Sequence, residues 1–341
     1  GMTESAADSI LDWIDPDSEP RPLGAEDDYY SGLDSAHTAR NGIPESLEEL
    51  LLVKEVTRDL LFGADTNRNY VVDEYERQAR LSNLQAARRA AGGLPWSAYL
   101  TTCSAERNLS PQGLPRIDLN RGDLAALHLS LTEALDARWA KFVVAYRQFG
   151  PSTRSSSAGS NASDALDLTR PPTVRIDSIY DLVGTRVEFP TASPDEPAAV
   201  IESPARDNRE SMRNELPKLL DAATTYGGAV IHGRINVNAA SQAVLGGVPG
   251  IDDALAEQIV SARGAQVGSR RPETRHACWL LTDGLVDVEK MKAIAPFLTG
   301  GGDVYGAQIV GSWDDPAPSA RVEVVIDSSV LPPRVLSRSD L

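Results

Sequence analysis

The chain of 341 residues contains no run of apolar residues approaching the length of about 18 that crosses a bilayer. It has only two cysteines, Cys103 and Cys278, too few for a disulfide framework. The two could pair in an oxidising compartment or stay free in a core, and we expect both to be free. Basic residues are also scarce: 33 face 49 acidic ones, a net charge of −16. Such a surface repels DNA, RNA and anionic lipid and attracts divalent cations. These shortages exclude a disulfide-stapled scaffold and disfavour binding to nucleic acid.

Catalytic motifs are missing as well. No G-x-S-x-G elbow, phosphate-binding loop or dinucleotide fingerprint occurs. Pairs of carboxylates occur in any acidic protein and do not identify a glycosidase. The histidines are scattered, and none has metal-ligand spacing: His37, His128, His232 and His276. We therefore expect that the chain is not an enzyme.

Acidic residues gather in one stretch, residues 8–30. Its apolar spacing predicts a short helix that ends at Asp15, because Pro16 disfavours helical geometry in the residue before it. Prolines and a glycine then turn the chain, so a second acidic cluster returns toward the first. The stretch is either a solvated acidic loop or a Ca²⁺ site. The candidate ligands are Asp15, Asp17, Glu26 and Asp27.

A second candidate Ca²⁺ site lies at residues 65–76, between a helix predicted from Pro44 to about Phe62 and a second helical segment at 77–91. Oxygen-bearing side chains occupy positions 1, 3, 5, 9 and 12 of an EF-hand-like loop, and a backbone carbonyl would serve at position 7. Tyr70 stands at position 6, where glycine normally supplies a positive φ. The alternative is a connector rich in Asx turns. The candidate ligands are Asp65, Asn67, Asn69, Val71, Asp73 and Glu76.

Two segments further along match one another. RIDLN at 116–120 leads to a helix at 140–147, and RINVN at 234–238 leads to a helix at 256–263. Each has an asparagine able to cap a helix, so we expect a repeat-like helical region. The second segment closely resembles a helix–hairpin–helix, but Asp252 and Asp253 stand where a phosphate would approach. We therefore expect this hairpin to serve packing rather than DNA binding.

The remaining segments alternate between loop, helix and strand signals. A Ser-rich stretch opens a central insert with short strands and a helix near 209–225. The C-terminal segment alternates as strands at 304–313 and 321–326, with an edge strand at 335–338. The fold class predicted is α+β, with a mainly helical domain carrying helix–hairpin–helix-like repeats and a small antiparallel β region. The predicted divisions are 1–150, 151–230, 231–298 and 299–341.

The stretch DWIDPDSEPRPLGAEDDYY (12–30) resembles a segment of the K-class minor pseudopilins of type II secretion, general secretion pathway protein K. The hairpin segment and the C-terminal strands are similar to that family too. The resemblance implies a helical domain inserted into a pilin-like sheet and a periplasmic location. It also implies assembly with the I-class and J-class minor pseudopilins at the pseudopilus tip, which supports protein export.

The resemblance further implies an N-terminal hydrophobic helix that anchors the protein in the inner membrane. That helix is absent from this sequence, and Gly1-Met2 is typical of a cloning scar, so we expect truncation. Membrane contact would come only through that helix. A helix–hairpin–helix nucleic-acid binder of the DNA-uptake type is the rival interpretation, and a calcium-dependent adhesin is a third.

Overall fold

The computed structural model describes residues 2–65, 74–81, 95–152, 166–189, 198–264, 271–312 and 319–340. The chain is a mixture of helices and small sheets and divides into two compact units. Unit 1 comprises residues 1–104, 305–327 and 332–341, and unit 2 comprises residues 105–304 and 328–331. These limits differ from the four divisions drawn from composition, because a compact unit is defined by contacts that composition does not record.

The N-terminal part of unit 1 is built from short helices around a small apolar core. Trp13 and Tyr30 meet edge to face at 5.2 Å between ring centroids, and Leu50, Leu61 and Phe62 pack in the same cluster. The helices are α1 (Glu4–Ile14), α2 (Asp27–Tyr30), η1 (Leu47–Leu52), α3 (Arg58–Leu61), α4 (Glu74–Leu81) and η2 (Trp96–Ala98). The two termini of α1 are well defined: Thr3 caps its start, and Asp15 ends it as expected.

The sequence predicted one helix from Pro44 to about Phe62, and this prediction is wrong. Glu55 has φ of +64°, which no right-handed helix accommodates. The hydroxyl of Thr57 then accepts from the N–H of Leu60 and starts a new helix, α3. The break allows the apolar residues before and after it to enter the same core.

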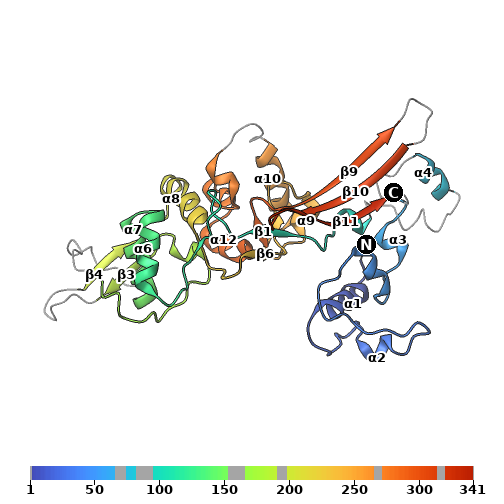
Figure 1. The fold of residues 1–341 in the computed structure, drawn as a ribbon, viewed down its shortest axis with the longest axis horizontal. Coiled ribbons are helices and arrows are strands. Elements are labelled where there is room, and N and C mark those ends of the chain that lie inside the picture. The colour runs from blue at the N-terminus through green and yellow to red at the C-terminus, as the bar shows by residue number, and fades with distance from the viewer. Residues whose placement is uncertain are drawn as a thin grey trace. The chain divides into compact units, whose positions relative to one another are not determined.

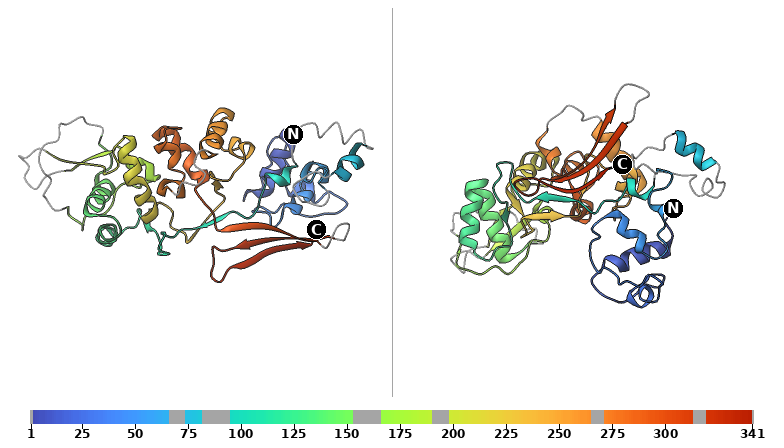
Figure 2. Two further views of the ribbon diagram at one scale, coloured as in Figure 1. Left: turned by 90° about the horizontal axis from the view of Figure 1, so that it is seen from above. Right: turned by 45° about the vertical axis from the view of Figure 1, so that its right-hand side comes forward.

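The other part of unit 1 is a three-stranded sheet with the order β11–β10–β9 (Figure 1). Its strands are β9 (Val304–Ser312), β10 (Ser319–Asp327) and β11 (Arg334–Asp340). β10 and β11 pair antiparallel, with Val324 opposite Arg338, and Figure 2 shows the three strands side by side. The three C-terminal strands predicted from alternation are confirmed.

Unit 2 alternates helices with very short strands. Its elements are β1 (Ala105–Arg107), β2 (Ile117–Asp118), α6 (Leu124–Ala134), α7 (Ala137–Phe149), η3 (Ile179–Leu182), β3 (Arg186–Phe189), β4 (Ala199–Glu202), α8 (Arg209–Ala222), β5 (Ala223–Thr224), β6 (Val230–His232), β7 (Ile235–Asn236), α9 (Gln242–Gly246), α10 (Asp253–Gly264), η4 (Pro272–Arg275), α11 (Trp279–Thr282), α12 (Val288–Ile294), η5 (Ala295–Phe297) and β8 (Leu298–Thr299). One apolar core runs through them and includes the buried side chains of Trp139, Phe142, Leu216 and Trp279.

Two modules within unit 2 share the same construction. The first module, residues 116–226, pairs β2 parallel with β5, and the second module, residues 234–301, pairs β7 parallel with β8. In the first, the side-chain amide of Asn120 donates to the carbonyl of Ile176; in the second, that of Asn238 donates to Thr274 and Gly300. Each module therefore begins and ends at a two-residue parallel strand pair, and an asparagine just after its first strand binds backbone further along the module.

An arginine near the end of the second helix completes the match. Arg147 of α7 donates to the carbonyl of Leu119, and Arg263 of α10 donates to the carbonyls of Val237 and Ala240. In each module the arginine therefore ties its helix to the backbone that follows the first strand. The sequence match between 116–147 and 234–263 reflects this shared construction.

Candidate functional site

The candidate site lies at the end of α1, where the chain leaves the helix and folds back along it. Asp12 is fully buried on this helix and accepts hydrogen bonds from the backbone N–H of Arg21 (3.1 Å) and of Ala25 (2.8 Å). The guanidinium of Arg21 binds both Asp12 (2.6 Å) and Asp15 (2.5 Å). One buried carboxylate and one arginine thus hold residues 16–25 against the helix.

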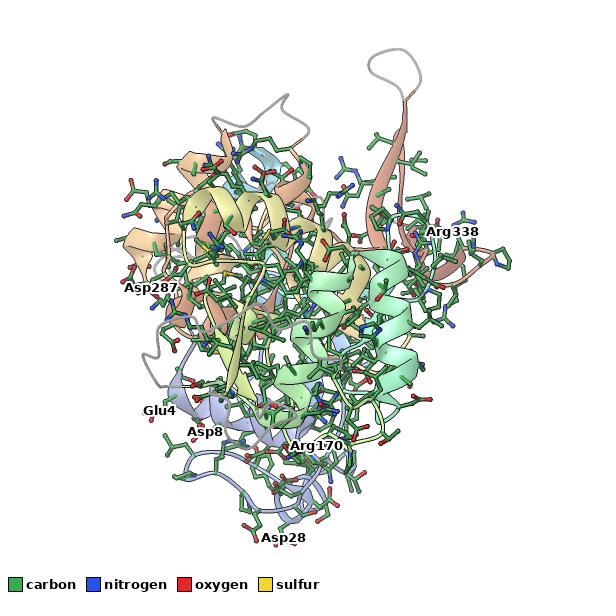
Figure 3. All side chains as sticks on the ribbon, turned by 90° about the vertical axis from the view of Figure 1, so that its left-hand side faces the viewer. Glu4, Asp8, Asp28, Arg170, Asp287 and Arg338 are labelled. Atoms are coloured by element: carbon green, nitrogen blue, oxygen red, sulfur yellow. The ribbon has the colours of Figure 1, made fainter. Side chains whose placement is uncertain are left out.

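Further contacts fix the same loop. Asp8 accepts from the backbone N–H of Leu23 at 3.2 Å, and Lys54 donates to the carbonyls of Leu23 and Gly24. Asp8 and Asp28, both labelled in Figure 3, belong to this acidic N-terminal segment. The loop is therefore a defined structure rather than a freely solvated acidic strand.

The fold brings together three of the four acidic residues predicted as ligands here. Asp15, Asp17 and Glu26 each offer one carboxylate oxygen, and these oxygens lie within 4.8 Å of one another. Asp17 is exposed, Asp15 is partly buried and Glu26 is only 4% exposed. Asp27, the fourth predicted ligand, is not part of this group. Its carboxylate accepts a hydrogen bond from the backbone N–H of Ala39 at 2.7 Å.

Of these three residues, Glu26 has the environment that is least favourable for a negative charge. Both of its carboxylate oxygens are buried, and neither has a hydrogen-bond partner among the described residues. The same is true of Oδ1 of Asp15. Burial, and then the negative charges of Asp12 and Asp15, raise the pKa of Glu26 to about 7. A buried carboxylate without a partner is costly, and a bound cation would remove that cost.

The donor set fits a hard divalent cation. All of its ligand atoms are carboxylate oxygens, which Ca²⁺ prefers, and Ca²⁺ takes six to eight of them together with carbonyls and water. Arg21 is the one cation of residues 8–30, and it is already paired with Asp12 and Asp15. Asp17 and Glu26 therefore hold negative charge that no arginine or lysine of this stretch neutralises.

The second predicted site falls mostly outside the described residues. Asn67, Asn69, Val71 and Asp73 are not among them, and only the first and last candidate ligands, Asp65 and Glu76, are described. Both are buried, each at 2% exposure, and α3 and α4 flank the loop. Glu76 accepts from the hydroxyl of Tyr75 at 3.2 Å. The EF-hand-like ligand set stays a prediction.

The segment between α9 and α10 carries the two acidic residues that the sequence analysis singled out. Gly250 has φ of +91°, and Asp252 caps α10 through the N–H of Leu255 at 2.8 Å. Asp252 and Asp253 are both exposed. One lysine comes near from α12, since Nζ of Lys290 lies 3.8 Å from the point where a Cβ of Gly250 would stand. The sequence interpretation missed Lys290, because its approach depends on tertiary structure.

Asp12 and Arg21 are the residues of the candidate site that sequence reasoning missed. A signal for Arg21 existed, since it is the one basic residue of residues 8–30. Asp12 could be suspected from its place between Leu11 and Trp13, in an apolar part of the helix where an acidic side chain needs partners. Among the described residues, no helix is long and apolar enough to cross a membrane.

The N-terminal part of the chain is similar to a known protein family. Residues 1–62 match a family model described as type II secretion system (T2SS), protein K. The matched range contains α1, the folded-back loop and the whole Asp15–Asp17–Glu26 group. No curated protein and no solved structure matches the chain. The match supports membership of the type II secretion protein K family and a role in type II secretion.

Proposed function

We propose that this chain is a structural minor pseudopilin of the K class, acting in type II secretion. The observation that carries the proposal is the match of residues 1–62 to the protein K family model. The same range contains the Asp15–Asp17–Glu26 group. A structural role agrees with a site whose charges suit a cation and whose loop is tied down by Asp12 and Arg21. In this proposal the protein carries no enzymatic activity.

The proposed partners are the I-class and J-class minor pseudopilins, in the periplasm at the inner membrane. A subunit with a large helical part attached to a small sheet would end a fibre, because the helical part would block further stacking. Unit 2 supplies such a helical part. We therefore place this subunit at the pseudopilus tip.

Calcium is the proposed cofactor. It would bind Asp15, Asp17 and Glu26, neutralise the carboxylate of Glu26, which has no hydrogen-bond partner among the described residues, and stiffen the N-terminal helices. Its role in this proposal is to order the segment. No chemical step depends on it.

The test is co-purification of this protein with the I-class and J-class subunits, in calcium and in chelator. We expect a ternary complex in calcium and a weaker one in chelator. In the presence of calcium, the Glu26→Gln variant should form a weaker complex, as the wild type does in chelator. Asp28→Asn is the matched control, because Asp28 is exposed and lies outside the cluster.

Failure of the complex in both conditions would overturn the pseudopilin proposal. A complex that ignores chelator and Glu26→Gln would keep the pseudopilin assignment and remove calcium from it. The rival function, DNA binding through the α9–α10 hairpin, has one observation in its favour, the approach of Lys290 to Gly250. Asp252 and Asp253 oppose it, so we expect no duplex DNA binding even at low salt.

A further inference from the structure

Unit 2 contains a pocket of about 880 Å³ to which both modules contribute. From the first module come Arg116, just before β2, and residues of the segment 220–226. From the second come Arg234, just before β7, and the segment 298–301. Arg116 and Arg234 hold equivalent positions in the two modules, and each of these arginines lines the pocket.

The charges around the pocket are almost all neutralised in pairs. Arg107 binds Asp303 through its side chain (3.1 Å) and its backbone N–H. Arg234 binds Glu106 at 2.9 Å, and the same carboxylate accepts from the hydroxyl of Thr299.

The third lining carboxylate, Asp221, is occupied in the same way. It binds Arg275 and also the imidazole of His276 at 2.7 Å. Each of the three carboxylates therefore already has two partners. Asp177, the other acidic residue of the lining, lies at the surface and faces Arg175 at 3.5 Å.

Arg116 is the exception. Its Nε is buried from solvent and has no hydrogen-bond partner among the described residues, and none of the ion pairs there involves it. Burial lowers the pKa of this guanidinium, although the charges of Glu106, Asp221 and Asp303 act in the opposite direction. None of these carboxylates pairs with it directly, because each already binds another arginine.

We propose that the pocket binds a carboxylate, held by the guanidinium of Arg116. One unpaired positive charge matches a singly charged anion, while the acidic side chains around it disfavour a dianion such as phosphate. The planar fork of an arginine fits a planar carboxylate through two parallel hydrogen bonds. Apolar side chains, among them Leu109, Tyr226 and Ile231, would cover the rest of a small organic acid or an acidic peptide side chain.

The test uses the whole protein and follows the arginine Nε–Hε signals by NMR during titration with sodium acetate. Sodium chloride at equal ionic strength is the reference. We expect the Arg116 signal to shift and saturate in the millimolar range with acetate and to stay unchanged with chloride. Arg175 is the internal control, because its side chain is 72% exposed and does not line the pocket.

Variants and a second ligand sharpen the result. Arg116→Lys keeps the charge but loses the fork, so acetate affinity should fall at least tenfold, whereas Arg175→Lys should leave it unchanged. The peptide acetyl-Gly-Glu-Gly-amide should shift Arg116, and acetyl-Gly-Gln-Gly-amide should not. A peptide that binds tenfold more tightly than acetate identifies a protein partner as the source, and equal affinity identifies a small acid.

Equal, non-saturating shifts of Arg116 and Arg175 with every salt would overturn the proposal. A phosphate titration that saturates Arg116 at lower concentration than acetate would overturn it as well. Because the wild-type NMR signal is the primary measurement, a variant that fails to fold does not decide the outcome.

Discussion

Gly24 passes so close to Asp12 that a Cβ on the glycine would stand 1.8 Å from the carboxylate oxygen Oδ2. Non-bonded heavy atoms do not approach one another so closely, so a Cβ at residue 24 would force the backbone or the Asp12 side chain to move. The contact belongs to the fold-back of residues 16–25 on α1, which Asp12 holds through the N–H groups of Arg21 and Ala25.

We predict that Gly24→Ala lowers the free energy of unfolding by about 2 kcal/mol, because it displaces the buried carboxylate of Asp12 from its donors. Chemical denaturation followed by tryptophan fluorescence would measure the change, since Trp13 neighbours Asp12. Gly32→Ala is the matched control: a Cβ there would meet its nearest atom at 3.5 Å, an ordinary contact. Equal effects of the two substitutions would contradict the proposed role of Gly24.

The raised pKa of Glu26 predicts how stability depends on pH. The folded, calcium-free protein holds the Glu26 proton up to about pH 7, while the unfolded chain releases it near 4.5. Between these values the folded state binds more protons, so this residue makes the free energy of unfolding fall as pH rises. The loss is complete above about pH 7.

Thermal unfolding of wild type and Glu26→Gln in chelator, between pH 5 and 8, would check this. The difference in Tm should move in favour of Glu26→Gln as pH rises. Calcium should reverse the order at pH 7.5, because the ion needs the ionised carboxylate. A difference in Tm that is constant across this pH range would show that the Glu26 carboxyl does not titrate as its burial requires.

Calcium affinity should depend on pH for the same reason. Binding to Asp15, Asp17 and Glu26 displaces the Glu26 proton, so the apparent Kd should rise about tenfold per unit of pH below 7. Calorimetry at pH 5.5, 6.5 and 7.5 would measure it. Heats of binding in buffers of different ionisation enthalpy would count the proton released, and a count of zero at pH 6 contradicts the prediction.

The buried carboxylates Asp65 and Glu76 predict a second ion. Glu76→Gln should lower the calcium stoichiometry from two to one and leave the site at Glu26 intact. Glu74→Gln is the control, because Glu74 lies in the same helix with its side chain 72% exposed. A stoichiometry of two in Glu76→Gln would remove residue 76 from the ligand set.

The two modules offer a matched pair of arginines. Arg147 is buried and donates to the carbonyls of Leu119, Arg121 and Val174, whereas Arg263 is only partly buried and donates to two carbonyls. We predict that Arg147→Met costs about 3 kcal/mol of unfolding free energy and Arg263→Met about 1 kcal/mol. Urea denaturation would rank them, and the reverse order would contradict this comparison.

Local patterns were sufficient where local forces decide the structure. The end of α1 at Asp15, just before Pro16, and the three C-terminal strands were predictable, because a proline and a period-two alternation act within a few residues. The helix from Pro44 to Phe62 was not, since Glu55 takes a positive φ so that Leu50 and Leu61 can share one core. Tertiary packing overrode propensity there.

The candidate site shows the same division. The acidic side chains of residues 8–30 predict a cation site, but the path of the loop decides which of them come together. Asp27 faces the N–H of Ala39, a contact twelve residues away that no spacing rule encodes. The pairing of Asp303 with Arg107, 196 residues apart, was beyond any local pattern for the same reason.

The strand pairs that close the modules bear on how such a chain changes over evolution. Residue 117 meets residue 223 in the first module, and residue 235 meets residue 298 in the second. Between its paired ends each module leaves and returns at one place, and lengthening an exposed loop costs little entropy. New sequence can therefore enter such a loop while the paired ends stay together. The first module, residues 116–226, is longer than the second, residues 234–301, as such insertions would make it.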